Sequence, residues 1–177
     1  MPIIRNQSYQ LHQNESFQMK TKSIIFGIFT CIFFFTSCNK SVDVTAEKEA
    51  ITQTIKQFYQ SFESEDINLM SAVMAHDDDM LSFGTALGDL HESWGMWEKA
   101  HLAQFEALDD IVLTSKNLHV YTNPSATTAW FADVSDWSLA VQGEPLSLNN
   151  VRITGVLDKR EGAWKIVQIH ASVPQEE

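Results

Sequence analysis

The feature that constrains this sequence most is a change of hydrophobic period partway along the chain. Between residues 46 and 108, apolar side chains recur every three or four positions, the spacing of one face of an α-helix. From Ile111 onward they recur at every second position, the spacing of a β-strand. Helices followed by a run of strands predict an α+β domain, with a curved antiparallel sheet wrapped over about three N-terminal helices.

Three helices and five strands are expected. The first helix follows Thr45 as its N-cap and carries one apolar stripe, Ile51, Ile55, Phe58 and Phe62. A helix over 67–74 begins after Asp66, a short strand covers 80–85, and a third helix runs from about 92 to 108. The remaining strands are expected over 111–122, 127–141, 146–158 and 163–173, separated by turns at Asn123-Pro124-Ser125, Gly143-Glu144-Pro145 and Glu161-Gly162.

The N-terminal segment predicts an export signal. The apolar run 24–35 would span about 18 Å as a helix, well short of the ~30 Å hydrocarbon core of a bilayer. Lys20 and Lys22 precede this run, and the small residues Thr36 and Ser37 follow it. A charged start, a short apolar run and a small-residue end are typical of a secretory signal peptide.

Cys38 stands directly after the small pair, an arrangement that resembles the signal of a bacterial lipoprotein. The resemblance implies a signal peptide over 1–37, a lipidated Cys38 with a tether to residue 45, and a domain over 46–174. Such a protein would be anchored in the bacterial cell envelope, facing the periplasm or the exterior. Cleavage elsewhere and a retained short anchor are the alternatives, and Met19 is an alternative start because residues 1–18 carry no pattern.

Charge and cysteine content exclude several classes of function. Residues 38–177 carry 9 basic and 22 acidic side chains, a net charge of −13, so nucleic acid is not expected as a partner. Cys31 lies in the predicted signal and Cys38 takes the lipid, which excludes disulfide, cysteine-ligated zinc and cysteine-nucleophile chemistry in the domain. The acidic turn 76–79 lacks the glycine and spacing of a calcium loop, so neither a metal nor a cofactor is expected.

The end of the chain carries a family resemblance. The segment Trp164-Lys165-Ile166-Val167-Gln168-Ile169-His170-Ala171-Ser172-Val173-Pro174 resembles the W-x-I-V-x-x-H-x-S-x-P ending of SnoaL-like domains. Arg152-Ile153-Thr154 and Arg160-Glu161-Gly162-Ala163-Trp164 are similar to the preceding hairpin of the same group. The resemblance implies the cone-shaped nuclear transport factor 2-like fold, which encloses a pocket. That superfamily includes enzymes, oligomerisation modules and binding proteins, so the fold does not decide the function.

Strand alternation suggests where a site would lie. If Glu161-Gly162 is the hairpin turn, Arg152 lies opposite His170, and the two could hold an anionic or carbonyl-bearing ligand at the pocket wall. Asp133 lies on a strand face with aromatic neighbours, where a carboxylate could act as acid or base. His170 and Asp133 are therefore the candidate catalytic residues. The alternatives are a structural Arg152–His170 pair, closed by Asp133 or Asp136, and a solvated Asp133 on the convex face.

Other side chains complete the candidate ligand-binding set. His101 and Trp97 share the apolar face of the third helix, and Trp164 opens the last strand; all three are candidate pocket residues that could equally belong to the core. His91 and His119 are expected on the surface. Ketosteroid isomerases resemble this layout but place a Tyr and an Asp where Phe58 and Ser82 or Phe83 stand here, which argues against steroid isomerisation.

Three functions remain open. The first is an envelope lipoprotein whose domain binds an unidentified small molecule without catalysis. The second is an acid–base enzyme of the isomerase, cyclase or dehydratase type that uses the same pocket. The third is a structural dimerisation module. A homodimer is expected in any case, because Val151, Ile153 and Leu157 alternate with a second apolar set, Leu146, Leu148 and Val156.

Overall fold

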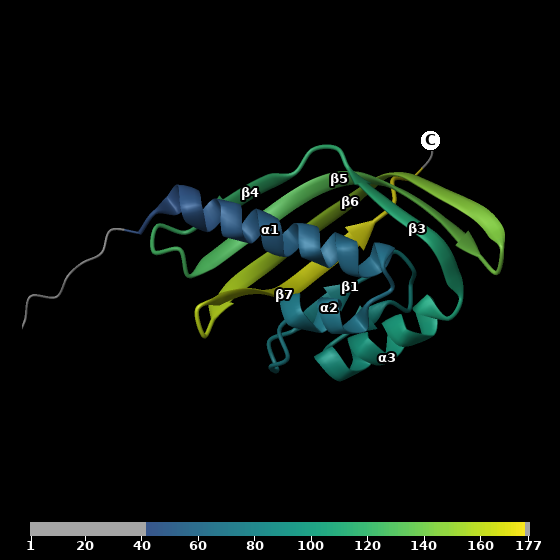
Figure 1. Ribbon diagram of the computed structural model, residues 1–177, viewed down its shortest axis with the longest axis horizontal. Helices are drawn as coiled ribbons and strands as arrows, with labels where there is room; N and C mark the ends of the chain where they lie inside the picture. Colours follow the sequence, from purple (N-terminus) through teal and green to yellow (C-terminus); the bar gives the residue numbers. More distant parts are fainter. Residues whose placement is uncertain (1–41, 176–177) are drawn as a thin grey trace, which may run out of the picture. The chain divides into compact units, whose positions relative to one another are not determined.

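The computed structural model describes residues 42–175, and these form three helices and a seven-stranded sheet. The predicted signal over 1–37, the alternative start at Met19 and the lipidated Cys38 lie outside the described residues. In Figure 1 the sheet arches over α1, and α2 and α3 lie beside it. The helices are α1 (Val44–Glu63), α2 (Ile67–Val73) and α3 (Trp94–Phe105). The strands are β1 (Leu81–Phe83), β2 (Leu90–His91), β3 (Leu108–Ser115), β4 (His119–Thr122), β5 (Thr128–Val141), β6 (Glu144–Arg160) and β7 (Ala163–Ser172).

The helix starts follow from carboxylate capping. Oδ1 of Asp43 accepts hydrogen bonds from the backbone N–H groups of Thr45 and Ala46, so α1 begins earlier than predicted and Thr45 is not its cap. Asp66 caps α2 in the same way, as predicted. In each case the carboxylate satisfies N–H groups that have no partner within the helix.

The α+β prediction is confirmed, but the sheet is mixed rather than wholly antiparallel. Its order is β2-β1-β7-β6-β5-β3, with β4 also paired to β5. β1 runs parallel to β7, and the chain passes through all the other strands before β7 returns beside β1. The predicted strand 111–122 is two strands, β3 and β4, separated by a short break at residues 116–118. The two-residue strand β2 was not predicted.

Besides an irregularity on β3 near Asp110, two β-bulges decide which side chains of β6 and β7 face the helices. On β7, Val167 is an extra residue between the pairs Leu157–Ile166 and Val156–Gln168, so Ile166 and Val167 are both buried. On β6 the extra residue lies near Asn150, whose φ of 57° is left-handed. Because side chains alternate along a strand, one extra residue exchanges the two faces for everything beyond it.

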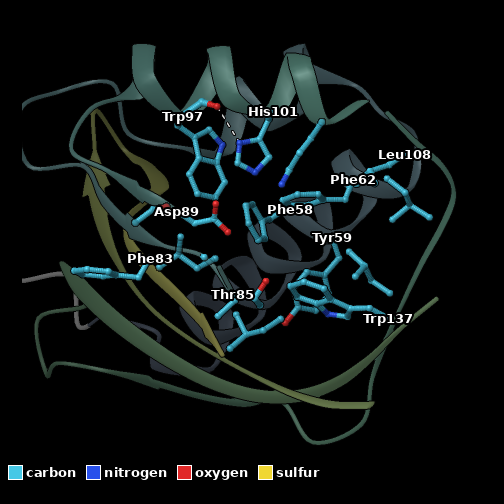
Figure 2. Close-up of a pocket in the computed structure, with 18 of the residues that line it drawn as sticks. Phe58, Tyr59, Phe62, Phe83, Thr85, Asp89, Trp97, His101, Leu108 and Trp137 are labelled. Atoms are coloured by element: carbon cyan, nitrogen blue, oxygen red, sulfur yellow. Dashed lines mark hydrogen bonds between the residues drawn. The ribbon is translucent and has the colours of Figure 1, made fainter. Parts of the chain in front are cut away.

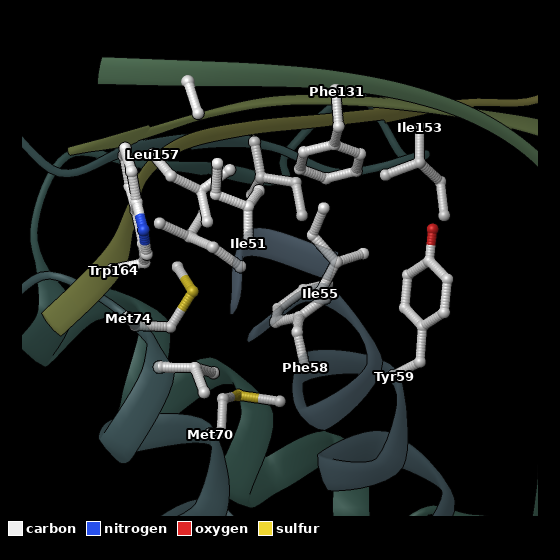
Figure 3. Packing of buried hydrophobic residues seen from close by; sticks show 14 of the residues in the cluster. Ile51, Ile55, Phe58, Tyr59, Met70, Met74, Phe131, Ile153, Leu157 and Trp164 are labelled. Carbon is white, nitrogen blue, oxygen red and sulfur yellow. The ribbon is translucent and has the colours of Figure 1, made fainter. Parts of the chain in front are cut away.

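One half of the domain has a tightly filled core. In Figure 3, Ile51 and Ile55 of α1 pack below the sheet, with α2 on their other side. Gly155 of β6 makes room for a ring here, because a Cβ at this position would lie 2.5 Å from Cε1 of Phe131. The side chains buried almost completely in this half come from α1, from α2 and its end, and from the sheet: Ile51, Ile55, Met70, Met74, Phe131, Leu157 and Ile166.

Polar contacts close the outer end of this filled core. The carboxylate of Glu47 accepts hydrogen bonds from Nζ of Lys159 and from Nε1 of Trp164, which joins the start of α1 to the β6–β7 hairpin. These bonds hold the pKa of Glu47 below its usual value, the contact with Lys159 contributing most. Within residues 42–175, no helix has the length and apolar character needed to cross a membrane.

Candidate functional site

The other half of the domain contains a cavity of about 120 Å³. It lies between the second half of α1, the helix α3 and the inner face of the sheet, as Figure 2 shows. Its lining residues come from nearly every element: Phe58, Tyr59, Phe62, Ser82, Phe83, Gly84, Thr85, Asp89, His91, Trp97, His101, Gln104, Leu108, Ile111, Leu113, Trp137, Leu139, Ile153, Ile169 and Ala171.

Aromatic rings build the helical side of the cavity. Trp97 and His101 of α3 stack with ring centroids 3.9 Å apart, and Phe62 of α1 meets His101 edge-on at 5.3 Å. Phe58 packs edge-on against Phe62 at 5.1 Å. Nε1 of Trp97 donates to Sδ of Met70, which fixes the indole between α2 and the cavity. These contacts pack the rings against one another and shape the helical wall of the cavity.

His101 presents a hydrogen-bond acceptor to the cavity. Its Nδ1 lies 2.9 Å from the carbonyl oxygen of Trp97, and because a carbonyl only accepts, Nδ1 carries the proton. The other nitrogen, Nε2, then has a lone pair, and Figure 2 shows it directed toward the cavity. Burial lowers the pKa of His101 to about 4, so the imidazole is neutral at pH 7.

Asp89 brings a carboxylate to the same cavity. The loop between β1 and β2 folds back on itself, since the Gly84 N–H donates to the Asp89 carbonyl at 2.8 Å and the Ala86 N–H donates to Oδ2 at 2.9 Å. The loop requires glycine at position 84, because a Cβ there would lie 2.6 Å from Cβ of Asp89. Figure 2 shows the carboxylate pointing inward beneath Trp97.

A buried pair, Tyr59 and Asp133, lies at the sheet side of the cavity. The Tyr59 hydroxyl donates to Oδ2 of Asp133 at 3.0 Å, and the Asn117 N–H donates to Oδ1 at 3.1 Å. Burial and the negative charge of Asp133 raise the pKa of Tyr59, so its phenol stays protonated. Asp133 is only 3% exposed and does not line the cavity; its link to the cavity is Tyr59.

The predicted Arg152–His170 pair does not face the cavity. Arg152 pairs with Ser172, and His170 pairs with Thr154, so the predicted register is wrong by two residues. Both side chains are exposed on the outer face of the sheet, where His170 contacts the ring of Phe83. One residue of this difference comes from the β6–β7 turn, where Arg160 pairs with Ala163, and the other from the bulge at Val167, which turns Ile169 and Ala171 inward and His170 outward.

The remaining candidates divide between the two halves of the domain. Trp97 and His101 line the cavity, as predicted, whereas Trp164 is buried in the filled core against Glu47. His91, expected on the surface, lines the cavity, with Nδ1 3.4 Å from Oγ of Ser82. No set of three or more His, Cys, Asp and Glu side chains within residues 42–175 is placed to hold a metal ion.

Sequence reasoning missed Asp89 and set Tyr59 aside. Tyr59 follows Phe58 directly and so points in a different direction from α1, but the cavity is wide enough to be lined by both. For Asp89 a signal existed, since the glycines at 84 and 88 indicate a turn that brings the next side chain back toward the core. The direction of that side chain depends on the loop's own hydrogen bonds.

Comparisons with known proteins agree with this architecture. Residues 51–176 match the SnoaL-like domain family, and the chain belongs to that family. No curated protein sequence matches the chain. A nuclear transport factor 2-like superfamily protein from Salmonella enterica serovar Typhimurium has a similar structure, with a TM-score of 0.68 and 14% identity over 75% of this chain and 94% of the other.

Two further solved structures have the same fold. A candidate dehydratase of the nuclear transport factor 2-like family from Streptomyces avermitilis gives a TM-score of 0.67 and 16% identity, covering 75% of this chain and 99% of the other. A candidate ketosteroid isomerase from Shewanella frigidimarina gives a TM-score of 0.57 and 19% identity, covering 71% of this chain and 97% of the other. At these identities the likeness shows the fold alone.

Proposed function

We propose that this domain binds a small, mainly apolar organic molecule in the cavity beside α3. The observation that carries the proposal is a cavity of about 120 Å³ walled by fixed aromatic rings in a domain whose other half is filled. A cavity of roughly 150 Å³ lined by apolar side chains is large enough to admit benzene. The natural ligand, or the part of it that enters, is therefore about the size of one ring.

The test is a pair of alanine-to-leucine variants on opposite faces of the sheet. Ala171 faces the cavity, whereas Ala132 lies on the outer face of β5. Titration with isobutanol, followed through the indole N–H signals of Trp97 and Trp137, is expected to shift both signals in the wild type. Ala171→Leu should abolish these shifts, and Ala132→Leu should keep them. Equal binding by the two variants would place the probe elsewhere and contradict the proposal.

Acid–base catalysis is a second candidate, favoured by the presence of Asp89 and neutral His101 at one cavity. Either group can accept a proton from a bound substrate, and His101 has the lone pair already directed inward. Relatives with this fold include the dehydratase and ketosteroid isomerase candidates named above. The Tyr59 hydroxyl, which could otherwise donate to a substrate oxygen, is already used by Asp133. For this reason we favour binding.

Deuterium exchange separates the two functions. A small ketone such as butanone, incubated with the protein in D₂O, would exchange the protons next to its carbonyl if the cavity catalyses proton transfer. Catalysis predicts exchange above the buffer rate that is lost in Asp89→Asn or His101→Gln. Exchange at the buffer rate, with binding intact, supports the binding function.

We further propose that the protein is a lipoprotein of the bacterial cell envelope. The short apolar run 24–35, the preceding Lys20 and Lys22, and Cys38 after Thr36-Ser37 support this. Mass spectrometry of the natively expressed protein should find a diacylglyceryl group on Cys38 as the first residue. Cys38→Ser should lose the modification and Cys31→Ser should keep it; cleavage at another position would contradict the proposal.

A homodimer through the outer face of the sheet is also proposed. Tyr121 and Trp130 stack there with centroids 5.9 Å apart, and each is 47% exposed. The aliphatic face expected from Leu146 and Leu148 does not exist as predicted, because the bulge near Asn150 places Leu148 against the core. Light scattering of residues 39–177 should give a dimer that Trp130→Lys dissociates, and a monomer at tens of micromolar would refute it.

A further inference from the structure

The charges around the cavity restrict what can enter it. Among the lining residues that the structure describes there is one carboxylate, Asp89, and no Lys or Arg. His101 is neutral at pH 7, so it adds no positive charge. An anionic ligand would lose its water in the presence of a like charge and find no cation in return. The charges of the lining residues therefore disfavour the anionic ligand that an inward-facing Arg152 would have held.

Two hydrogen-bonding groups of the cavity, on Asp89 and His101, also disfavour an anion, because they are acceptors. Oδ2 of Asp89 accepts one hydrogen bond, from the Ala86 N–H, while Oδ1 accepts none from residues 42–175. Nε2 of His101 is also an acceptor, and no group in that part of the chain donates to it. A ligand that satisfies these groups must itself donate, and an ammonium group donates up to three hydrogen bonds.

The rings complete this selection. Phe58, Phe62, Trp97 and Trp137 surround the space into which Asp89 points (Figure 2). Aromatic faces attract cations, and this attraction strengthens when the cation leaves water. Residues 38–177 also carry a net charge of −13, which raises the local concentration of cations near the domain.

We propose that the cavity binds a small organic amine in its protonated form, with the ammonium on Asp89 and the hydrocarbon part against the aromatic rings. This inference rests on the proposed binding function and names the chemical class of its ligand. It differs from the prediction drawn from strand alternation, which was an anionic or carbonyl-bearing ligand held by Arg152 and His170. The carboxylate that carries it comes from the loop between β1 and β2.

Three probes with one carbon skeleton test the proposal: isobutylammonium, isobutanol and isobutyrate. Each is titrated into the 15N-labelled domain, and the indole signals of Trp97 and Trp137 report on the cavity. Trp130 on the outer face and Trp164 in the filled core serve as internal controls. Isobutylammonium is expected to bind about 10-fold more tightly than isobutanol, because a charge-assisted hydrogen bond replaces a neutral one. Isobutyrate should bind more weakly than both.

Asp89→Asn is the decisive variant, since the asparagine oxygen can still accept from the Ala86 N–H and keep the loop closed. In this variant isobutylammonium and isobutanol should bind about equally tightly, because the charge that favours the ammonium is gone. Asp78→Asn changes the net charge equally at an exposed turn and should leave the preference intact. Equal or tighter binding of isobutanol or isobutyrate to the wild type overturns the amine proposal but keeps the binding function. If no probe shifts Trp97 and Trp137, the binding function itself fails.

Discussion

The two ends of α1 lie in different surroundings although one apolar stripe runs along the whole helix. Toward its start, Ile51 and Ile55 are completely buried among aliphatic and methionine side chains. Toward its end, Phe58 and Phe62 face the cavity, with polar groups among their neighbours. The same sheet covers both ends, so the fold itself does not require a cavity. The side chains at the second end are large but rigid, and they meet edge-on instead of filling the space.

The comparison is tested most strongly by two matched isoleucines. Ile55 is 0% exposed in the filled half, and Ile153 is 2% exposed where the sheet borders the cavity. Ile55→Ala is expected to cost about 4 kcal/mol of unfolding free energy, because it opens a new void among close-packed neighbours. Ile153→Ala should cost about 2 kcal/mol, because one side of this residue already lacks packing partners. Urea denaturation measures both values, and equal costs would mean that the cavity is packed in solution.

The cavity half should also respond to pH. The pKa of His101 is about 4 in the folded domain and ordinarily near 6.5, so the unfolded chain binds the proton more readily between these values. The stabilising contribution is complete above pH 6.5 and is lost progressively as the pH falls to about 4, by up to about 3 kcal/mol. His101→Gln should remove this part of the pH dependence. Parallel profiles for wild type and variant would show that His101 titrates normally.

The wall between the cavity and the sheet depends on Tyr59. Tyr59→Phe leaves Oδ2 of buried Asp133 without its donor and is expected to cost about 2 kcal/mol. Tyr121→Phe removes a hydroxyl from an exposed ring and should change stability by less than about 0.5 kcal/mol. Thermal denaturation of the two variants gives the comparison. A similar small loss in both would mean that water replaces the Tyr59 hydroxyl.

The smallest effect is expected at the outer end of the filled half. Glu47→Gln weakens the contacts with Lys159 and Trp164 and should cost about 1 kcal/mol at low salt, less at high salt. Glu49→Gln, an exposed position on the same helix, should change stability by less than about 0.5 kcal/mol. Urea denaturation at two salt concentrations measures both. A loss that does not change with salt would assign the effect to packing instead of charge.

The elements that form through contacts between residues close together in the sequence were predictable. The stripe of α1, the Asp66 cap and the turn at Glu161-Gly162 each need only a few consecutive residues to form. The face of Arg152 and His170 was not predictable in this way. Val167, the extra residue on β7, is an ordinary strand former, so nothing in its type marks a bulge. Asn150 carried a weak signal, because asparagine tolerates a left-handed conformation.

The site was predicted in part for a similar reason. Trp97 and His101 follow from helical spacing, because one face of α3 must be buried. Asp89 follows from a loop that closes through its own backbone, and only the three-dimensional path of that loop brings its carboxylate inward. A strongly acidic composition gave no guide to which of many carboxylates would line the cavity.

The bulge on β7 gives this domain a simple route to a different chemistry. Deleting Val167 would restore strict alternation and exchange the faces of the last few residues of the strand. His170 would then face the helices in place of Ile169 or Ala171, and an imidazole would line the same cavity as Asp89. A single codon deletion could therefore turn a largely apolar binding wall into one with an added acid or base. Within a lineage that shares this fold, gains and losses of one strand residue can change function more than many substitutions.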